Sequence, residues 1–172
     1  KDEYLLIHAN VLPTKAIISK LKKLQHGEFL TTGSEGGMAY KFSDKEVQGL
    51  HKIKVNRSFV YKGDIKAIHY PWQIFQLNDW AIRADFEMIS SGRKSKPISK
   101  TNKLVKPSGI FAEAGATIEH CILNASEGPI YIGKNARIME GSLLRGPIAI
   151  CEGAVVKMGT KIYGATTIGP YC

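Results

Sequence analysis

The sequence contains no apolar run long enough to span a membrane, and no basic leader precedes its apolar segments. These absences favour a soluble chain without a membrane partner, which we expect in the cytoplasm. Cysteine is also scarce. The three cysteines, Cys121, Cys151 and Cys172, are odd in number and lack metal-ligand spacing, which argues against a disulfide framework and a zinc site. We interpret them as free thiols in a reducing compartment, two of them as apolar filler.

Glycine motifs that bind phosphate are missing as well. Neither Gly-x-Gly-x-x-Gly nor a phosphate loop occurs anywhere in the 172 residues. The one glycine-rich stretch, Gly33 to Gly37, lies between expected strands, which predicts a turn rather than the start of a phosphate-binding helix. We therefore do not expect residues 1–172 alone to turn over a nucleotide.

Aromatic residues make up 9% of the chain and are not interleaved with basic ones, as stacking on single-stranded nucleic acid requires. The net charge is nevertheless +9, because residues 1–103 hold 18 Lys and Arg against 10 Asp and Glu, whereas residues 104–172 hold 6 against 5. Four of these lysines lie on the polar face of one expected helix: Lys15, Lys20, Lys22 and Lys23. We expect no nucleic-acid partner and interpret the surplus as serving an anionic small substrate, such as a nucleotide or a sugar phosphate.

The clearest pattern that is present repeats every six residues. An aliphatic residue recurs at each sixth position: Ile132, Ile138, Leu144, Ile150, Val156, Ile162 and Ile168. A mostly small residue stands four positions after each: Ala136, Ser142, Ile148, Ala154, Thr160, Thr166 and Cys172. Neither a helix nor a flat strand has this period. It predicts a solenoid of triangular coils, with one aliphatic side chain per face pointing inward and a small residue at each corner.

The repeat continues towards the N-terminus with one irregularity. Ile118 and Ile122 fit the pattern, but Ile118 and Ile132 are fourteen residues apart where two repeats would give twelve. Turn-forming residues 124–129 are expected to form a bulged corner that absorbs the two extra residues. The solenoid is therefore predicted to begin near Ile110.

A helical bridge is expected before the solenoid. The run Pro71-Trp72-Gln73-Ile74-Phe75 starts a helical region, and Asn78 is expected to cap a longer helix. Trp72 and Phe75 are interpreted as packing anchors, and residues 93–107 as an extended linker. The predicted domains are an α/β piece at 1–70, the bridge and linker at 71–109, and the β-helix at 110–172.

The first part of the chain has the pattern of an α/β domain. Tyr4 to His8 is an apolar run typical of a buried parallel strand. A polar loop leads to Thr14, the expected N-cap of an amphipathic helix that stops at Gly27. Strand, loop and helix make half of a βαβ unit. Further strands are expected at Phe29–Thr31, Met38–Phe42, Lys52–Val55, Ser58–Tyr61 and Ile65–Ile68.

The six-residue repeat resembles that of the hexapeptide acyltransferases, most plainly at Ile132-Gly133-Lys134-Asn135-Ala136-Arg137 and Ile168-Gly169. The resemblance implies a left-handed parallel β-helix, a homotrimer, acyl-coenzyme A as co-substrate and a histidine as general base. His120, the only histidine after residue 69, is the candidate base for acyl transfer. Counterparts of the family's basic phosphate contacts are Lys134, Arg137, Arg145, Lys157 and Lys161. The alternative for these five is an ordinary solvated surface.

A second resemblance concerns the residues Ile7-His8-Ala9-Asn10-Val11-Leu12-Pro13. They resemble the loop of nucleotide-sugar synthases in which an aspartate helps to hold the Mg²⁺ that bridges nucleotide and sugar phosphate. Asn10 takes the place of that aspartate, so the resemblance implies Asn10 as a ligand of metal and substrate, although an amide brings no charge to the metal. The alternative is that the Asn10 side chain only stabilises a turn. The synthases' Gly-rich loop with Arg and Lys is absent.

The motif Pro-Trp-x-Ile-Phe-x-x-Asn at residues 71–78 and the following residues 81–86 resemble the bridge in bacterial proteins related to N-acetylglucosamine-1-phosphate uridylyltransferase. Those proteins join a nucleotidyltransferase domain to a left-handed β-helix. The resemblance covers the whole chain and suggests that it is an internal fragment. It implies an enzyme that converts a nucleoside triphosphate and a sugar 1-phosphate into a sugar nucleotide and pyrophosphate, with an acyltransferase-like β-helix. The alternative is a non-catalytic trimeric scaffold with a degenerate nucleotide-binding domain.

Overall fold

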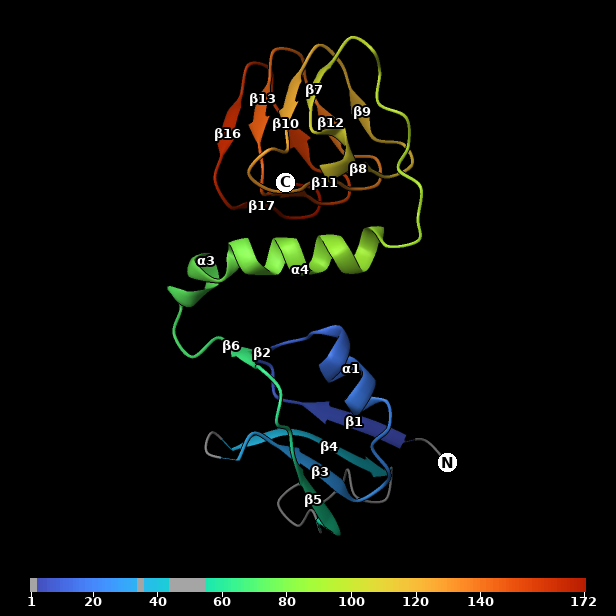
Figure 1. The fold of residues 1–172 in the computed structure, drawn as a ribbon, viewed down its shortest axis with the longest axis vertical. Coiled ribbons are helices and arrows are strands. Elements are labelled where there is room, and N and C mark those ends of the chain that lie inside the picture. Colours follow the sequence, from blue (N-terminus) through green and yellow to red (C-terminus); the bar gives the residue numbers. More distant parts are fainter. Residues whose placement is uncertain (1–2, 34–35, 44–54) are drawn as a thin grey trace. The chain divides into compact units, whose positions relative to one another are not determined.

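The computed structural model describes residues 3–33, 36–43 and 55–172 (Figure 1). The chain forms two compact units, Lys1–Pro71 and Trp72–Cys172. An α/β region is followed by a parallel β-solenoid, as the sequence predicted.

The first unit is built on a four-stranded sheet. Its strands are β1 (Glu3–Ile7), β3 (Glu28–Thr31), β4 (Gly37–Ser43) and β5 (Arg57–Val60), in the order β1-β4-β3-β5. β4 runs antiparallel to both β1 and β3, and β3 runs parallel to β5. β1, β3 and β5 therefore point the same way, so their carboxyl ends lie at one edge of the sheet.

Helix α1 (Lys15–Leu21) covers one face of this sheet. The Thr14 hydroxyl accepts a hydrogen bond from the Ile17 backbone N–H at 3.2 Å, which confirms the predicted N-cap. Ile17 and Leu21 are buried with Leu30 of β3 and Ala39 of β4 in one apolar core. β1, α1 and β3 thus form a crossover between parallel strands, with β4 inserted between them.

Strand β1 differs from the prediction of a buried parallel strand. It pairs antiparallel with β4, and all five of its residues are exposed, including Leu6 at 52%. The apolar run alone could not show this, because a buried central strand and an edge strand have the same composition.

The remaining strands of the first unit are short. β2 (Val11–Leu12) pairs antiparallel with β6 (Lys66–Ala67). The strands predicted at Phe29–Thr31, Met38–Phe42 and Ser58–Tyr61 correspond to β3, β4 and β5. Of the strand predicted at Lys52–Val55, residues 52–54 lie outside the described residues.

The second unit contains three parallel sheets that form the walls of one solenoid (Figure 1). Their inward side chains form a common apolar core. The first consists of β7 (Lys103–Val105), β10 (Ile122–Asn124), β13 (Leu143–Arg145) and β16 (Lys161–Tyr163). The second consists of β8 (Ile110–Ala112), β11 (Ile130–Ile132), β14 (Ile148–Ile150) and β17 (Thr166–Ile168). The third consists of β9 (Thr117–Ile118), β12 (Arg137–Ile138) and β15 (Val155–Val156). The 3-10 turn η2 (Pro107–Gly109) precedes β8.

The six-residue repeat fills the interior as predicted. Ile132 and Ile150 have no exposed surface, and Ile138, Leu144 and Val156 are at most 3% exposed. Parallel pairing stacks equivalent residues of neighbouring coils, for example Ile132 beside Ile150. Each coil therefore buries its apolar side chains only with its neighbours present.

The solenoid begins earlier than the sequence indicated. β7 pairs in parallel with β10, and Ile98 and Leu104 pack against the solenoid core. The Lys96 backbone N–H already donates to the Ala112 carbonyl at 2.8 Å. The ordered solenoid therefore includes most of the segment expected to be a linker. The sequence did not reveal this, because the exposed prolines and lysines of the segment obscure the six-residue repeat.

The structure confirms an enlarged corner at residues 124–129, between β10 and β11, but the inward residue before it differs from the prediction. The ladders align Ile118 with Ile138, Leu123 with Leu144 and Ile132 with Ile150. The step from Ile118 to Leu123 is therefore one residue shorter than the aligned step from Ile138 to Leu144. The step from Leu123 to Ile132 is three residues longer than the aligned step from Leu144 to Ile150, so the net difference is two residues. Leu123 points inward with no exposed surface, whereas Ile122 is 40% exposed.

This alignment can be tested with two chemically identical substitutions. Ile132→Ala should lower the free energy of unfolding by about 2–5 kcal/mol, because it leaves a cavity in the solenoid interior. Ile122→Ala should lower it by less than about 1 kcal/mol, because that side chain is partly solvated. Urea unfolding of both variants measures the difference. Equal losses would contradict the outward position of Ile122.

The helices of the second unit are α3 (Gln73–Gln76) and α4 (Asn78–Ser90). Two predictions about them are wrong. Trp72 and Phe75 are 51% and 69% exposed, so they do not anchor the helices in a core. Asn78 is the first residue of α4 and does not cap it: its amide donates to the Ala165 carbonyl at 3.0 Å and accepts from the Thr167 hydroxyl at 2.8 Å.

Helix α4 lies against the solenoid through further polar contacts. Arg83 donates to the Glu127 carbonyl at 2.8 Å and forms an ion pair with Asp79 at 2.7 Å. The hydrogen bond that Arg83 donates holds the pKa of the Asp79 carboxyl below its usual value. The bridge helix is therefore held at the loop between β10 and β11 as well as at β17.

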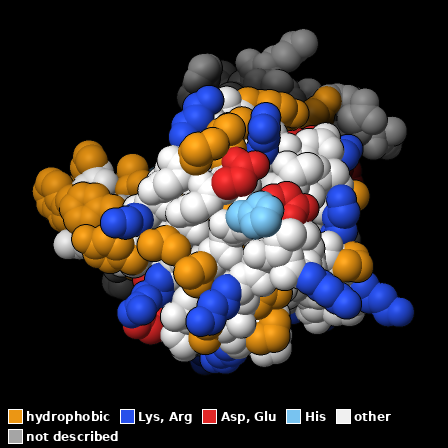
Figure 2. Space-filling view, turned by 90° about the horizontal axis from the view of Figure 1, so that it is seen from above, with side chains coloured by type: hydrophobic (Ala, Val, Ile, Leu, Met, Phe, Trp, Pro, Cys, Tyr) orange, Lys and Arg blue, Asp and Glu red, His pale blue; other side chains and the backbone are white. Residues whose placement is uncertain are grey.

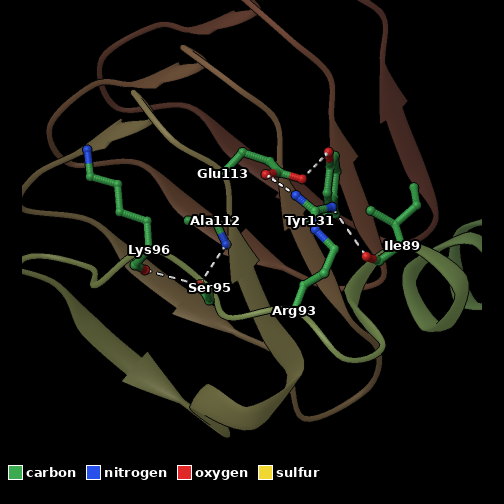
Figure 3. Close-up of polar contacts among 7 residues, drawn as sticks. All are labelled: Ile89, Arg93, Ser95, Lys96, Ala112, Glu113 and Tyr131. Carbon is green, nitrogen blue, oxygen red and sulfur yellow. Dashed lines mark hydrogen bonds and ion pairs between the residues drawn. The ribbon is translucent and has the colours of Figure 1, made fainter.

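The C-terminal end of α4 is held by Arg93 (Figure 3). Its guanidinium donates to Glu113 at 2.7 Å and to the Ile89 carbonyl at 3.3 Å, and lies 5.3 Å from the centre of the Phe111 ring. Glu113 also accepts from the Tyr131 hydroxyl at 3.1 Å, and the Tyr131 ring stacks on Phe111. Partial burial, and secondarily the Glu113 carboxylate, raise the pKa of Tyr131 to about 12.

A raised tyrosine pKa predicts a stability loss at high pH. The contribution of the neutral phenol is fully present below its ordinary pKa of 10 and is lost as pH rises through the folded-state pKa of about 12. The difference in unfolding free energy between the unmodified protein and Tyr131→Phe should therefore shrink from pH 9 to pH 11. Denaturant titrations at both pH values measure it. The exposed Tyr163→Phe is the control and should show no such change; a constant difference for Tyr131→Phe would contradict the prediction.

Candidate functional site

The loop after β1 lies at the edge where the carboxyl ends of β1, β3 and β5 meet. In open α/β sheets this edge is the usual place for a ligand. His8 N–H donates to the Met38 carbonyl at 2.8 Å, Val11 N–H to the His8 carbonyl at 3.2 Å, and Ile68 N–H to the Asn10 carbonyl at 2.8 Å. Backbone groups thus hold the loop to β4 and to the segment after β6.

Asn10 itself is half-buried in this loop. Within the described residues its side-chain amide makes no hydrogen bond, so the turn is closed by backbone groups instead. The amide is therefore available to a ligand, and its role in binding substrate or metal stays a prediction.

A cavity of about 390 Å³ adjoins this loop. Its walls come from the end of β1, from His8 and Ala9, and from Phe29 and Tyr40. Phe29 and Leu6 both pair with Tyr40, so these side chains lie on the sheet face opposite Leu30, Ala39 and α1. A Cβ at Gly37 would lie 2.5 Å from the Phe29 ring, so glycine is needed there for the ring to cover the strand.

The aromatic character of this face was not predicted. The Phe29 and Tyr40 ring centroids are 6.5 Å apart, and Tyr40 stacks on Phe42 at 6.1 Å. Such a wall, next to His8 and the Asn10 loop, suits a planar apolar group with polar groups at its edge. Alternation of aromatic residues along the expected strand Met38–Phe42 was the signal that could have revealed it.

The expected magnesium site requires charged oxygen ligands, since Mg²⁺ is usually held by one or two carboxylates together with substrate phosphates. Asn10 supplies an uncharged oxygen, and the described ranges contain no cluster of three or more His, Cys, Asp or Glu side chains. These residues do not form a magnesium site by themselves. As a ligand of a metal carried by substrate phosphates, Asn10 remains a prediction.

His120 lies at an exposed corner of the solenoid, with a left-handed backbone at φ 53°. The ladder aligns Ile122 with Leu143 and Leu143 with Lys161, so His120 occupies the same corner as Gly141 and Gly159. Those glycines have φ 74° and 70°. The corner requires a left-handed residue, which explains the His120 backbone without any catalytic role.

This explanation predicts an effect on stability. His120→Gly should raise the free energy of unfolding by about 1 kcal/mol, because glycine adopts the left-handed region without a Cβ clash. His120→Ala keeps that clash and should give no gain. Thermal unfolding of the two variants measures this. A loss of stability in His120→Gly would show instead that the imidazole makes a contact of value.

Three of the five basic residues predicted to bind phosphate lie on the surface of the solenoid. Lys134, Arg137 and Lys157 are exposed, and Arg137 pairs along the ladder with Val155. On the face seen in Figure 2, basic side chains lie apart from one another and a histidine lies beside acidic side chains. Binding roles for these three residues therefore stay predictions.

Two other candidates, Arg145 and Lys161, do line a groove. It has a volume of about 620 Å³ and lies over β10, β13 and β16, with Ile122 and Leu143 in its floor. Arg145 forms an ion pair with Glu127 at 3.0 Å, so its charge is partly neutralised.

Comparison with protein families assigns the first half of the chain. Residues 1–94, just over half of the 172, match the model of a family described as sugar nucleotidyl transferase. The matched part includes the Asn10 loop, the first unit and both helices α3 and α4. No curated protein matches the sequence significantly. None of the helices in the described ranges is long and apolar enough to cross a membrane. The chain belongs to the sugar nucleotidyl transferase family.

Proposed function

We propose that the protein forms a sugar nucleotide from a nucleoside triphosphate and a sugar 1-phosphate. The observation that carries this proposal is the family match over residues 1–94. The Asn10 loop supports it, because the loop lies at the carboxyl edge of the sheet beside an aromatic cavity. The bridge motif at residues 71–78 favours uridine diphosphate N-acetylglucosamine as the product. The three free thiols favour a cytoplasmic protein.

The reaction is an in-line displacement. A phosphate oxygen of the sugar 1-phosphate attacks the α-phosphorus of the triphosphate, the bond to the bridging oxygen of the β-phosphate breaks, and pyrophosphate leaves with that electron pair. Positioning and stabilisation of charge carry such a reaction, without a covalent enzyme intermediate. In this chain, the aromatic wall of Phe29 and Tyr40 would orient an apolar group, and the Asn10 amide would bind a phosphate or sugar oxygen.

The second candidate function is that of a non-catalytic scaffold. The sheet of β7, β10, β13 and β16 has an apolar outer strip, with Val105, Ile122 and Leu143 between 37% and 40% exposed and Tyr163 at 80%. Such a strip favours side-by-side packing of solenoids, as in a homotrimer. The uncharged Asn10 also favours a domain that has lost its chemistry. Acyl transfer has less support, because the solenoid geometry accounts for the conformation of His120.

Pyrophosphate release tests the enzymatic proposal. The protein, together with any sequence that flanks residues 1–172, is incubated with Mg²⁺ and a panel of nucleoside triphosphates and sugar 1-phosphates. We expect release for one pair of substrates. Asn10→Ala should lower its rate by about tenfold through loss of a substrate contact, about 1.4 kcal/mol. Asn10→Asp should retain or raise it, because a carboxylate is the better magnesium ligand.

The exposed Gln76→Ala is the matched control, because its amide belongs neither to the Asn10 loop nor to the lining of the aromatic cavity and its loss should leave the rate unchanged. Absence of pyrophosphate for every substrate pair would reject the transferase and leave the scaffold. Unchanged release in Asn10→Ala would remove Asn10 from the site.

A further inference from the structure

A second cavity lies on the other face of the sheet, between α1 and β5. Its volume is about 700 Å³, within the range typical of small-molecule sites. Ala16, Lys20 and Lys23 form one wall, and residues 59–63 form the other. Leu30 pairs with Phe59 along the ladder and with Ala39 on the other side, which places this groove on the α1 face. It is therefore separate from the aromatic cavity beside the Asn10 loop.

The bottom of this groove is apolar. Leu24 and Leu30 are each 4% exposed, and the half-buried Phe59 packs against the same core. Val60 follows Phe59 in β5, so its side chain lies on the face away from α1, and the residue is 57% exposed. The Arg57 guanidinium lies 5.0 Å from the Phe59 ring centre and holds that ring in place.

The rim of the groove is positively charged. Ala16 and Lys20 are four residues apart in α1, so they project from one side of that helix, and Lys23 follows in the turn after it. Lys62 comes from the opposite wall. In the described part of the chain these three lysines form no ion pair. The single acidic lining residue, Glu28, already accepts the Gln25 backbone N–H at 2.8 Å.

Three ammonium groups around an apolar groove produce a positive potential that an anion relieves. An inorganic ion would leave the apolar bottom of the groove uncovered. The two features together select an anion that carries a flat or aliphatic body.

We propose that this groove binds a nucleoside phosphate, with the base against Leu30 and Phe59 and the phosphate among Lys20, Lys23 and Lys62. The choice of a nucleoside phosphate over another amphipathic anion rests on the proposed function. Charge attraction supplies affinity for the phosphate, and burial of the base against the apolar bottom distinguishes the ligand from free phosphate.

Calorimetric titration with uridine and adenosine 5′-monophosphates tests the groove, with inorganic phosphate and uridine as separate probes. The double variant Lys20→Gln with Lys62→Gln removes two rim charges. The double variant Lys15→Gln with Lys22→Gln removes the same charge from exposed positions of the same helical segment outside the groove. We expect saturable binding of at least one monophosphate, weakened at least about tenfold in the rim variant and changed by less than about twofold in the control.

The apolar half of the groove has its own variant. Ala16→Leu places a larger side chain in the groove and should weaken the nucleoside monophosphate at least about fivefold. Inorganic phosphate should bind at least about tenfold more weakly than the monophosphate to the unmodified protein. Far-ultraviolet circular dichroism verifies that every variant is folded.

Three results would overturn the proposal: no saturable binding of either monophosphate, equal affinity in the two double variants, or equal affinity for phosphate and nucleoside monophosphate. The titrations contain neither sugar phosphate nor magnesium. Failure to release pyrophosphate would therefore reject the transferase alone, whereas failure to bind a monophosphate would reject the groove alone.

Discussion

The second unit depends on the stacked columns of aliphatic side chains inside the solenoid. Ile132 lies beside Ile150 through the parallel ladder, and both are fully buried. No single coil has enough apolar surface to be stable alone, so burial is shared between neighbours. The stacked coils then present the fixed edges to which α4 binds. The contacts of Asn78 with β17 and of Arg83 with Glu127 depend on that regular framework.

The matched family segment and the compact units have different boundaries. The family match ends at residue 94, whereas the first compact unit ends at Pro71. Helix α4 thus belongs to the family segment by sequence and to the solenoid by packing. Arg93 shows how this is achieved, because it binds both the last turn of α4 and Glu113 of the solenoid. The helix is a shared element rather than a passive spacer.

The first unit offers two chemically different cavities on opposite faces of one sheet. The face with Phe29 and Tyr40 is aromatic and adjoins the Asn10 loop, whereas the α1 face has an apolar bottom and a lysine rim. Both follow from strand alternation, which sends successive side chains to opposite faces. The charge surplus of residues 1–103 is thereby partly explained, since Lys20, Lys23 and Lys62 gather at one groove.

The period of six by itself determined the solenoid, because no other regular structure buries every sixth residue. The motifs at Thr14 and the alternating strands likewise determined the first helix and most of the sheet. Only the tertiary structure decided that Leu123, rather than Ile122, points into the solenoid. One step of the coil is shorter than the repeat and the next is longer, and the sequence shows only their sum. The tertiary structure also decided that β1 is exposed, that Asn78 binds a neighbouring strand, and that His120 occupies a left-handed corner. Each of these depends on which segments become neighbours in space, and spacing along a chain does not contain that information.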